Sequence, residues 1–435
     1  MNNDNINLFK FIHLNVSEID LDKTIVIPAK SVEENTIIHL YIKEKDTDRF
    51  CDFCGSNSCI IHDRIKKEIN HCILLERKIK LIFYQIKFKC KFCKTTHLQT
   101  PSFIGSTKSI SKAGEIEALH QLRKPNNTFE YVSSSLSIPE TTLVRLFDNH
   151  VDIKRHTLGK RLCFDEFYSK KLGRTKYCFT IYDLDKNEII DILDSRYKEV
   201  LLNYFSKIPL NERLNVEFVN IDMWSTYYEV AIKVFPNATV CVDSFHVIEH
   251  LISALDGIRK RIQNTFLNNK DTDRNGYYWI LKSFHYYLTT NMDNIKYNRK
   301  PRSHYSYLYT KYDVLEKVLS TSSDLRIAYA LKESYREFNI TANYDEAKEK
   351  IPEYIEVFKA SKFAEFREFG RMIERWQNQI INSFIVVNGK RNSNGPIESL
   401  NSRIKKLISR GNGFKSFERF RNKVMFSLNK NEPIK

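Results

Sequence analysis

The sequence predicts a multidomain protein of the α+β class, in which small modules precede a larger mixed α/β core. Three observations lead to this prediction. Two Cys-x-x-Cys motifs lie near the N-terminus, the hydrophobic periodicity becomes strand-like near Arg161, and the stretch after His250 is almost wholly helical in pattern. A chain of 435 residues is long enough for two to four domains.

The composition indicates a folded chain. Hydrophobic residues make up 42% and charged residues 28%, so there is enough apolar material for real cores. No apolar stretch reaches the roughly 18 residues of a membrane span, and Met1–Asn7 is polar. The sequence therefore argues against an exported or membrane-spanning protein.

The charge balance and the cysteines indicate a partner and a compartment. Lys and Arg number 69 against 53 Asp and Glu, a formal charge of +16, which makes nucleic acid the first candidate partner. The nine cysteines are odd in number, which disfavours a disulfide framework. We expect a cytoplasmic protein.

The first module is expected to bind zinc. Its two cysteine pairs, Cys51/Cys54 and Cys90/Cys93, are separated by 35 residues, and each follows a strand-like run. Two residues between thiolates let one tight turn present both sulfurs to one metal, and two such turns complete a tetrahedral Zn²⁺ site. Buried free thiols are the alternative, and spacing leaves open several substitute ligands: Cys59, Cys72, His62, His71 and His97.

The next segment is expected to be helical. We predict helices over Ser111–Leu122, from an Asx cap at Asn127, and over Thr141–Val151 after a capping box at Ser137–Glu140. A short helix, a brief turn and a second helix outline a helix-turn-helix, although any small helical hairpin has the same pattern. The outward face of the last helix would carry the candidate DNA contacts Thr141, Thr142 and Arg145.

A mixed sheet follows. The patterns predict, in order, strands at 162–168, 177–182 and 188–193, a helix at 196–208, a strand at 216–222, a helix at 226–235 and a strand at 239–242. The first three strands form a predicted antiparallel meander. This order is that of a ribonuclease-H-like core.

Three carboxylates stand where this order would bring metal ligands together. Asp165 lies in the first strand, Asp222 ends the fourth, and Glu398 lies in the first turn of a helix that begins near Gly395-Pro396. Phosphodiester chemistry with two Mg²⁺ ions needs two or three carboxylates that converge from different elements. Each acid alone has an ordinary structural explanation, but together they predict a metal-dependent site. Strand alternation sends Asp165 and Glu166 to opposite faces.

The motifs resemble one known family. The sequence is similar to the ISL-three-type family of bacterial insertion-sequence DDE transposases in its two Cys-x-x-Cys pairs, Phe164–Phe167, Ile221–Trp224 with Tyr227, Phe235–Ala238, Val242–Val247, Ser393–Glu398 with Asn401 and Lys405, and Gly413–Arg421. The resemblance spans roughly residues 50 to 425, with the motifs in the expected order.

The resemblance implies a domain plan and a reaction. It implies a zinc-binding module (1–100), a helix-turn-helix domain (101–155), and a ribonuclease-H-like core (156–250 and 381–435) interrupted by an all-helical insertion (251–380). Asp165, Asp222 and Glu398 match the catalytic acids, which would hold two Mg²⁺ ions, with Mn²⁺ as a possible substitute. The resemblance also implies a structural Zn²⁺ in the N-terminal module. Asp243 and His246 match an Asp-x-x-His signature, and we expect a supporting role for them.

The implied partner is double-stranded DNA, both the terminal inverted repeats and the target. The resemblance further implies a homodimer or higher synaptic oligomer, associated with the nucleoid. Basic residues near Glu398 are expected to follow the DNA backbone: Arg403, Lys405, Lys406, Arg410, Lys415, Arg419, Arg421 and Lys423. The alternatives are a non-catalytic DNA-binding regulator derived from a transposase and a structure-selective nuclease.

Overall fold

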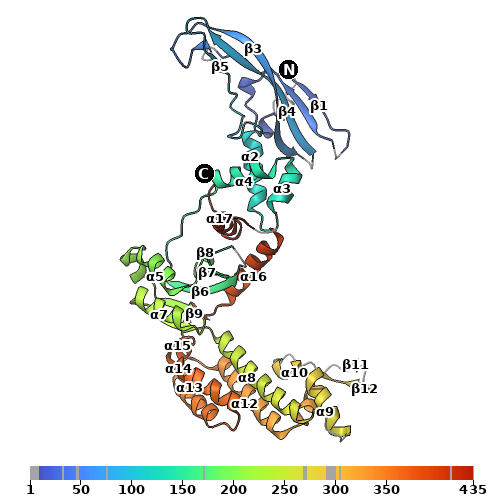
Figure 1. Ribbon diagram of the computed structural model, residues 1–435, viewed down its shortest axis with the longest axis vertical. Coiled ribbons are helices and arrows are strands. Elements are labelled where there is room, and N and C mark those ends of the chain that lie inside the picture. The colour runs from blue at the N-terminus through green and yellow to red at the C-terminus, as the bar shows by residue number, and fades with distance from the viewer. Residues whose placement is uncertain are drawn as a thin grey trace. The chain divides into compact units, whose positions relative to one another are not determined.

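The computed structural model describes residues 9–31, 34–45, 49–74, 77–169, 172–267, 272–290, 300–302, 305–411 and 414–434. The chain divides into two compact units (Figure 1). Unit 1 comprises Met1–Arg155 and Ile404–Lys435, and unit 2 comprises His156–Arg403. We had expected residues 381–435 to complete the core as one piece, whereas their last part clusters with the N-terminal unit. No helix in the described ranges has the length and apolar character needed to cross a bilayer.

Unit 1 begins with a five-stranded sheet in the order β1-β2-β4-β3, with β5 also paired to β4. Its elements are η1 (Val16–Glu18), β1 (Ile25–Ile27), β2 (Thr36–Leu40), β3 (Cys59–Leu74), β4 (Arg77–Cys90) and β5 (Thr96–Leu98). Strands β3 and β4 are antiparallel, and their register places Cys59 opposite Cys90. One cysteine pair precedes β3 and the other begins at Cys90, the last residue of β4, so the hairpin brings both pairs to the same end of the sheet.

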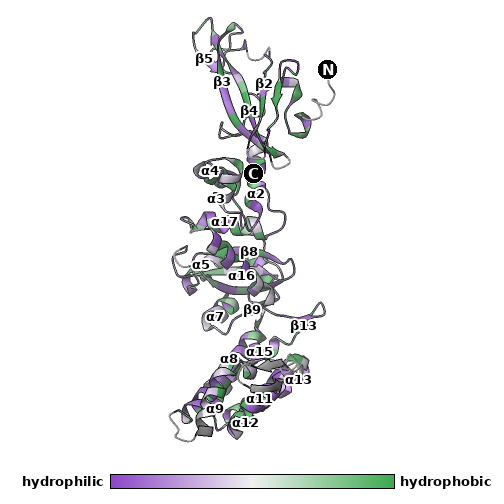
Figure 2. Ribbon diagram, turned by 90° about the vertical axis from the view of Figure 1, so that its right-hand side faces the viewer, coloured by the Kyte–Doolittle hydropathy of each residue, from purple (hydrophilic) through white to green (hydrophobic). Residues whose placement is uncertain are grey.

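Strand β3 was not predicted from the sequence. Charged residues interrupt its apolar alternation, and much of it is hydrophilic (Figure 2). It lies at the edge of the sheet, where lysines and β-bulges discourage pairing with another chain. The strand paired with it, β4, supplies buried Leu81, Phe83, Ile86 and Phe88 to the core.

The helices of unit 1 are α2 (Lys112–Arg123), α3 (Phe129–Leu136), α4 (Glu140–His150) and α17 (Phe417–Leu428). The first three lie where the sequence predicted helices, but two caps differ from the prediction. The hydroxyl of Thr128, not the side chain of Asn127, accepts the N-cap hydrogen bond of α3. Ser137 forms no capping box with Glu140, because its left-handed backbone (φ 54°) ends α3 and makes the turn into α4.

Helix α17 packs against these helices within unit 1. The ring of Phe426 lies 5.9 Å from that of Phe147, which in turn lies 5.4 Å from Phe129. Buried Lys423 donates to the carbonyl oxygens of Leu122 and Lys124 at the end of α2. These carbonyls have no helical partner, so the ammonium group acts as a C-cap.

Unit 2 contains a five-stranded sheet in the order β10-β9-β6-β7-β8. Its strands are β6 (Arg161–Tyr168), β7 (Tyr177–Asp183), β8 (Glu188–Leu193), β9 (Phe218–Ile221) and β10 (Thr239–Val242). The first three form the predicted antiparallel meander, and β9 and β10 add in parallel. Helices α5 (Lys198–Ser206), α6 (Leu210–Leu214) and α7 (Ser225–Val234) connect the strands, and only the short α6 was not predicted.

A helical subdomain lies between β10 and the last helix of the unit. It contains α8 (Ser244–Thr265), α9 (Thr272–Ser283), α10 (Tyr286–Thr289), α11 (Lys311–Leu319), α12 (Ser323–Thr341), α13 (Tyr344–Lys359), α14 (Ala364–Arg375) and α15 (Gln377–Asn382). Helices α12 and α14 pack against α8 (Figure 1). The expectation of an all-helical insertion is wrong in one respect, since β11 (Lys300–Arg302) and β12 (Tyr305–Tyr309) form a hairpin within it.

The chain then returns toward the sheet of unit 2. Strands β13 (Val386–Val387) and β14 (Lys390–Arg391) are joined by Asn388-Gly389, both with positive φ, as a tight hairpin turn requires. Helix α16 (Gly395–Arg410) follows. Its buried stripe includes Ile397, Leu400 and Ile404.

Candidate functional site

Four sulfur atoms converge at the end of the β3–β4 hairpin. The Sγ atoms of Cys51, Cys54, Cys90 and Cys93 all lie within 4.8 Å of one another. Cys51 Sγ is 3.5 Å from Cys93 Sγ, and Cys54 Sγ is 3.7 Å from Cys90 Sγ. A tetrahedron with Zn–S bonds of about 2.3 Å has S···S edges of about 3.8 Å. The spacing therefore fits a tetrahedral metal site.

The two cysteine turns have matching backbones. Gly55 N–H donates to Cys51 O at 2.9 Å, and Lys94 N–H donates to Cys90 O at 3.2 Å. Both donor residues have positive φ, 71° and 63°. Each turn thus curls its backbone N–H groups around a sulfur, which is the local geometry that the Cys-x-x-Cys spacing predicted.

The electrostatics of this cluster favour a cation. Hydrogen bonds from the Thr95 hydroxyl and from backbone N–H groups lower the pKa of Cys51 to about 5. A backbone N–H of Ser56 favours the thiolate of Cys54, but burial and the neighbouring thiols outweigh it and raise the pKa of Cys54 to about 12. Four sulfurs this close cannot all ionise without a positive charge between them, so the donor set fits Zn²⁺.

The substitute ligands left open by the sequence do not join the four sulfurs in the described structure. His71 is buried in unit 1, where its Nε2 contacts Ile12 O and its Nδ1 contacts Ser111 Oγ, both at 2.7 Å. Burial lowers the pKa of His71 to about 4, so its ring is neutral. Burial also raises the pKa of Cys59 to about 11, and Cys59 packs beside the cluster as a thiol.

A second cluster of titratable groups lies in unit 2 and consists of carboxylates and an imidazole. Asp165 lies on β6, Asp222 follows β9, Asp243 is the N-cap of α8, and Glu398 lies in the first turn of α16. Strands β10, β9 and β6 are neighbours and parallel, so the acids that end β9 and β10 meet at one edge. Ligand atoms of Asp243, His246 and Glu398 lie within 4.8 Å of one another.

His246 holds Asp222 beside this group. Its Nε2 lies 2.9 Å from Asp222 Oδ1, and its Nδ1 lies 3.1 Å from Glu249 Oε2. Burial alone would lower the pKa of His246, but the hydrogen bond to Asp222 and the charges of Asp222 and Asp243 raise it to about 9. The raised pKa favours the protonated ring, whose two N–H groups face the carboxylates of Asp222 and Glu249.

Two asparagines, one just before α16 and one within it, bind the aspartates near Glu398. Asn394 donates through Nδ2 to Asp222 Oδ1 at 3.2 Å and through its backbone N–H to Asp243 Oδ1 at 3.3 Å. Asn401 Nδ2 donates to Asp165 Oδ2 at 2.6 Å. These residues flank Glu398 at helical spacing, the signal by which the sequence could have revealed them. We had assigned them no role.

The neighbour of Asp165 is used differently. Glu166 accepts hydrogen bonds from Arg196 and from the Tyr227 hydroxyl. Asp165 contacts Asn401 instead. Because side chains alternate along β6, Glu166 points to one face and forms an ion pair, whereas Asp165 points to the other face and lies near the cluster.

The surroundings of the cluster raise the pKa of several of its carboxyl groups. Burial and the charge of Asp222 raise the pKa of Asp165 to about 7. Burial also raises the pKa of Asp243, and burial with the charge of Asp243 raises that of Glu398. Among the described residues, Asp243 Oδ2 and Glu398 Oε1 are buried without a hydrogen-bond partner. Crowded carboxylates with unsatisfied oxygens fit divalent cations that prefer oxygen ligands.

Comparison with known proteins identifies the family. The model of the ISL3-type DDE transposase family, described as "Transposase", matches residues 162–424, which is more than half of the chain and contains every carboxylate of the cluster. The chain belongs to the ISL3-type transposases. It is also 20% identical over 398 residues to the "Transposase for insertion sequence element IS1001" of Bordetella parapertussis, an alignment that covers 88% of this chain and 89% of that protein.

The predicted DNA contacts of this transposase are accessible side chains. On α4, Thr141 and Arg145 are exposed and Thr142 is half-buried. On α16, Arg403, Lys405 and Lys406 are all exposed. Their accessibility is compatible with the prediction, and their role stays a prediction.

Several other basic residues of the transposase C-terminus are engaged within unit 1. Arg419 forms two hydrogen bonds with the carboxylate of Asp148, and Arg421 donates to Ile153 O. Lys423 is buried, and burial lowers its pKa to about 7. The expectation that Lys423 follows the DNA backbone is therefore wrong, because its amine caps α2.

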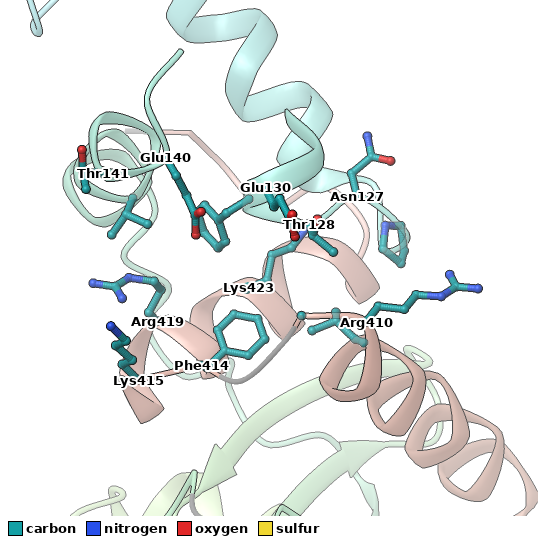
Figure 3. Close-up of a pocket in the computed structure, with 15 residues that line it drawn as sticks. Asn127, Thr128, Glu130, Glu140, Thr141, Arg410, Phe414, Lys415, Arg419 and Lys423 are labelled. Atoms are coloured by element: carbon teal, nitrogen blue, oxygen red, sulfur yellow. The ribbon is translucent and has the colours of Figure 1, made fainter. Parts of the chain in front are cut away.

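A cavity of about 580 Å³ separates the starts of α3 and α4 from the C-terminal segment. Figure 3 shows Phe414, Arg419 and Arg410 of this segment opposite Thr128, Glu130 and Glu140 of the helices. Cationic and acidic side chains line it together. Thr141 therefore lines a cavity whose other wall belongs to the C-terminal segment.

Proposed function

We propose that this transposase cleaves DNA at the ends of its insertion sequence and joins the released 3′ ends to target DNA, in a reaction that requires Mg²⁺. The observation that carries the proposal is a set of acids from separate elements of a domain that matches a DDE transposase family. Ligand atoms of Asp243, His246 and Glu398 lie within 4.8 Å of one another, His246 binds Asp222, and the charge of Asp222 raises the pKa of Asp165. The parallel and antiparallel strands of unit 2 support a ribonuclease-H-like core.

Asp165, Asp222 and Glu398 are the proposed ligands of two Mg²⁺ ions, for which Mn²⁺ is a substitute. Bound cations there would activate the attacking oxygen and stabilise the leaving oxygen of an in-line displacement. The chain itself supplies orientation and charge balance. Asn401 and Asn394 hold Asp165 and Asp222, and His246 balances the charge of Asp222.

Recognition of the terminal inverted repeats is proposed for unit 1. The Cys₄ cluster would hold a structural Zn²⁺, and α3 with α4 would act as a helix-turn-helix whose contacts are Thr141, Thr142 and Arg145. Arg403, Lys405 and Lys406 would bind phosphates near Glu398. We further propose a synaptic dimer or higher oligomer, because two ends must be joined, and a location at the bacterial nucleoid.

The test uses the purified full-length protein with labelled duplexes that carry the ends of its own element, Mg²⁺ and a supercoiled target. We expect nicks at the element ends followed by joined products, and loss of both in Asp165→Asn, Asp222→Asn and Glu398→Gln. Binding without cleavage by the wild-type protein would favour the regulator. Cleavage without joining would favour the nuclease. Full activity of the three variants would refute the residue assignment.

A further inference from the structure

A groove of about 540 Å³ lies on unit 2. It lies between the turn that precedes β7 and the turn that precedes α5. Its wall consists of cationic, aromatic and small neutral residues: Arg174, Lys176, Arg196, Tyr177, Tyr197 and the Gly173–Thr175 backbone. Its volume is in the range of sites that take a small organic ligand, roughly 300–1,000 Å³.

The two turns that form the groove are packed against each other. A Cβ atom at Gly173 would lie 2.3 Å from Asp194 O, so only glycine permits this approach. Arg174 Nε lies 2.6 Å from Asp194 Oδ2, and Ser169 N–H donates to Lys176 O at 2.8 Å. The groove is therefore a built feature of the fold.

Arg196 lies between the groove and residues that neighbour the cluster acids in the chain. Its guanidinium lies 4.2 Å from the centre of the Tyr177 ring and 4.6 Å from that of Trp224, and it binds the carboxylate of Glu166. Glu166 is next to Asp165 in the chain, and Trp224 is two residues beyond Asp222. The Trp224 ring covers Arg196.

The chemistry of the wall selects an anion that carries a flat ring. No carboxylate lines the wall, but Asp194 and Glu166 balance the charges of the two arginines from outside it, so the free positive charge of the wall comes from Lys176. In the described part of the chain, no carboxylate forms an ion pair with Lys176. Tyr197 is 62% exposed, which leaves its ring open for stacking. Phosphate with a stacked base satisfies both groups.

We propose that this groove binds an unpaired nucleotide of the DNA substrate next to the cleavage site. The proposal rests on the function proposed above and adds the place and the form of the substrate strand. The base stacks on Tyr197, and the adjoining phosphate contacts Lys176, while Arg174 stays paired with Asp194. Arg196, already paired, fixes the shape of the wall.

The test measures binding of two labelled 12-residue strands to the full-length protein by fluorescence anisotropy, one of oligothymidine and one of the same length with abasic residues. We expect Tyr197→Ala to weaken binding of oligothymidine about tenfold, as for the loss of one base stack, and to leave the abasic strand unchanged. Tyr197→Phe should bind as the wild type does. Tyr286→Ala, another exposed tyrosine of unit 2, is the matched control.

A second variant tests the charge. Lys176→Glu should weaken both strands by similar factors and reduce the slope of log affinity against log salt by about 0.7. Equal loss on both strands in Tyr197→Ala, or no loss on either, would overturn the assignment to an unpaired base. An equal loss on a fully paired duplex would assign the groove to the backbone of double-stranded DNA instead and would also overturn it.

These outcomes are separable from the proposed function. If the strands bind as expected but the wild-type protein does not cleave element ends, the groove stands and the catalytic proposal fails. If ends are cleaved and Tyr197→Ala binds and cleaves as the wild type does, the catalytic proposal stands and the assignment of the groove fails.

Discussion

The sulfur cluster of unit 1 and the carboxylate cluster of unit 2 both bring four like groups together, but from different distances along the chain. The sulfurs come from two turns at one end of a single hairpin, whereas the carboxylates come from β6, the ends of β9 and β10, and α16. Backbone N–H groups favour the charged form of Cys51 and Cys90, whereas burial and the neighbouring thiols disfavour that of Cys54. The carboxylates are buried against one another and resist ionisation.

Because of this difference, the two sites contribute to the folding free energy with opposite signs. A structural metal site adds folding free energy when its metal binds. A cluster of crowded acids costs folding free energy until a cation binds. Removing a ligand should therefore destabilise the first site, whereas neutralising an acid in the second should abolish activity without unfolding the chain.

The largest expected effect concerns the sulfur site. Cys51→Ser with Cys90→Ser should remove one Zn²⁺ per chain and the free energy of its binding, which is about 10–16 kcal/mol in small zinc domains. Metal analysis and hydrogen exchange should show zinc loss with faster exchange near the cysteine turns and unchanged exchange in unit 2. Cys59→Ser is the control, since Cys59 is buried beside the cluster without joining it. Zinc retained in the double variant would contradict the assignment.

The next effect concerns the carboxylate site. Glu398→Gln should lower the rate of end cleavage about 10³-fold, the equivalent of several kcal/mol of transition-state stabilisation. Its thermal stability should be equal to that of the wild type or higher, because a carboxylate whose pKa is raised in the fold is replaced by a neutral amide. Glu418→Gln, in the first turn of α17, is a matched control. A large drop in Tm for Glu398→Gln would give Glu398 a structural role.

A smaller effect separates His71 from the zinc site. The folded pKa of His71 is about 4, below the ordinary value of 6.5, so the unfolded chain binds the extra proton between these values. Its contribution to stability is complete above pH 6.5 and is lost as the pH falls toward 4, by about 2 kcal/mol at pH 5. Urea unfolding of unit 1 at pH 7 and pH 5 measures this loss. His71→Gln should reduce the pH dependence and keep the zinc, and zinc loss would restore His71 as a ligand.

The smallest effect tests the orientation of Asp165. Asn401→Ala should reduce cleavage about tenfold and raise the Mg²⁺ concentration needed for half-maximal rate, as for other residues that hold a metal ligand. Ser402→Ala, exposed on the same helix, should change neither. An unchanged Mg²⁺ dependence with a lower rate would place Asn401 in packing alone.

Local pattern predicted much of this fold. The strands of unit 2 and helices α2 to α4 lie close to the predicted ranges, because alternation and helical spacing report the buried face directly. Strand β3 was missed because its charged side chains hide the alternation at a sheet edge. The Ser137 cap was mistaken because a capping box and a left-handed turn use the same polar residues.

The sequence by itself determined the local turn of each Cys-x-x-Cys pair, because two residues between the thiolates set one tight turn whatever the rest of the chain does. It also placed Asp165, Asp222 and Glu398 on their elements. Only the tertiary structure decided that Asp243, His246 and Glu398 share one cluster, that Asn394 and Asn401 hold the aspartates, and that Lys423 caps α2. Such contacts join residues far apart in the chain, and their free energies depend on burial and on neighbours that no local spacing records.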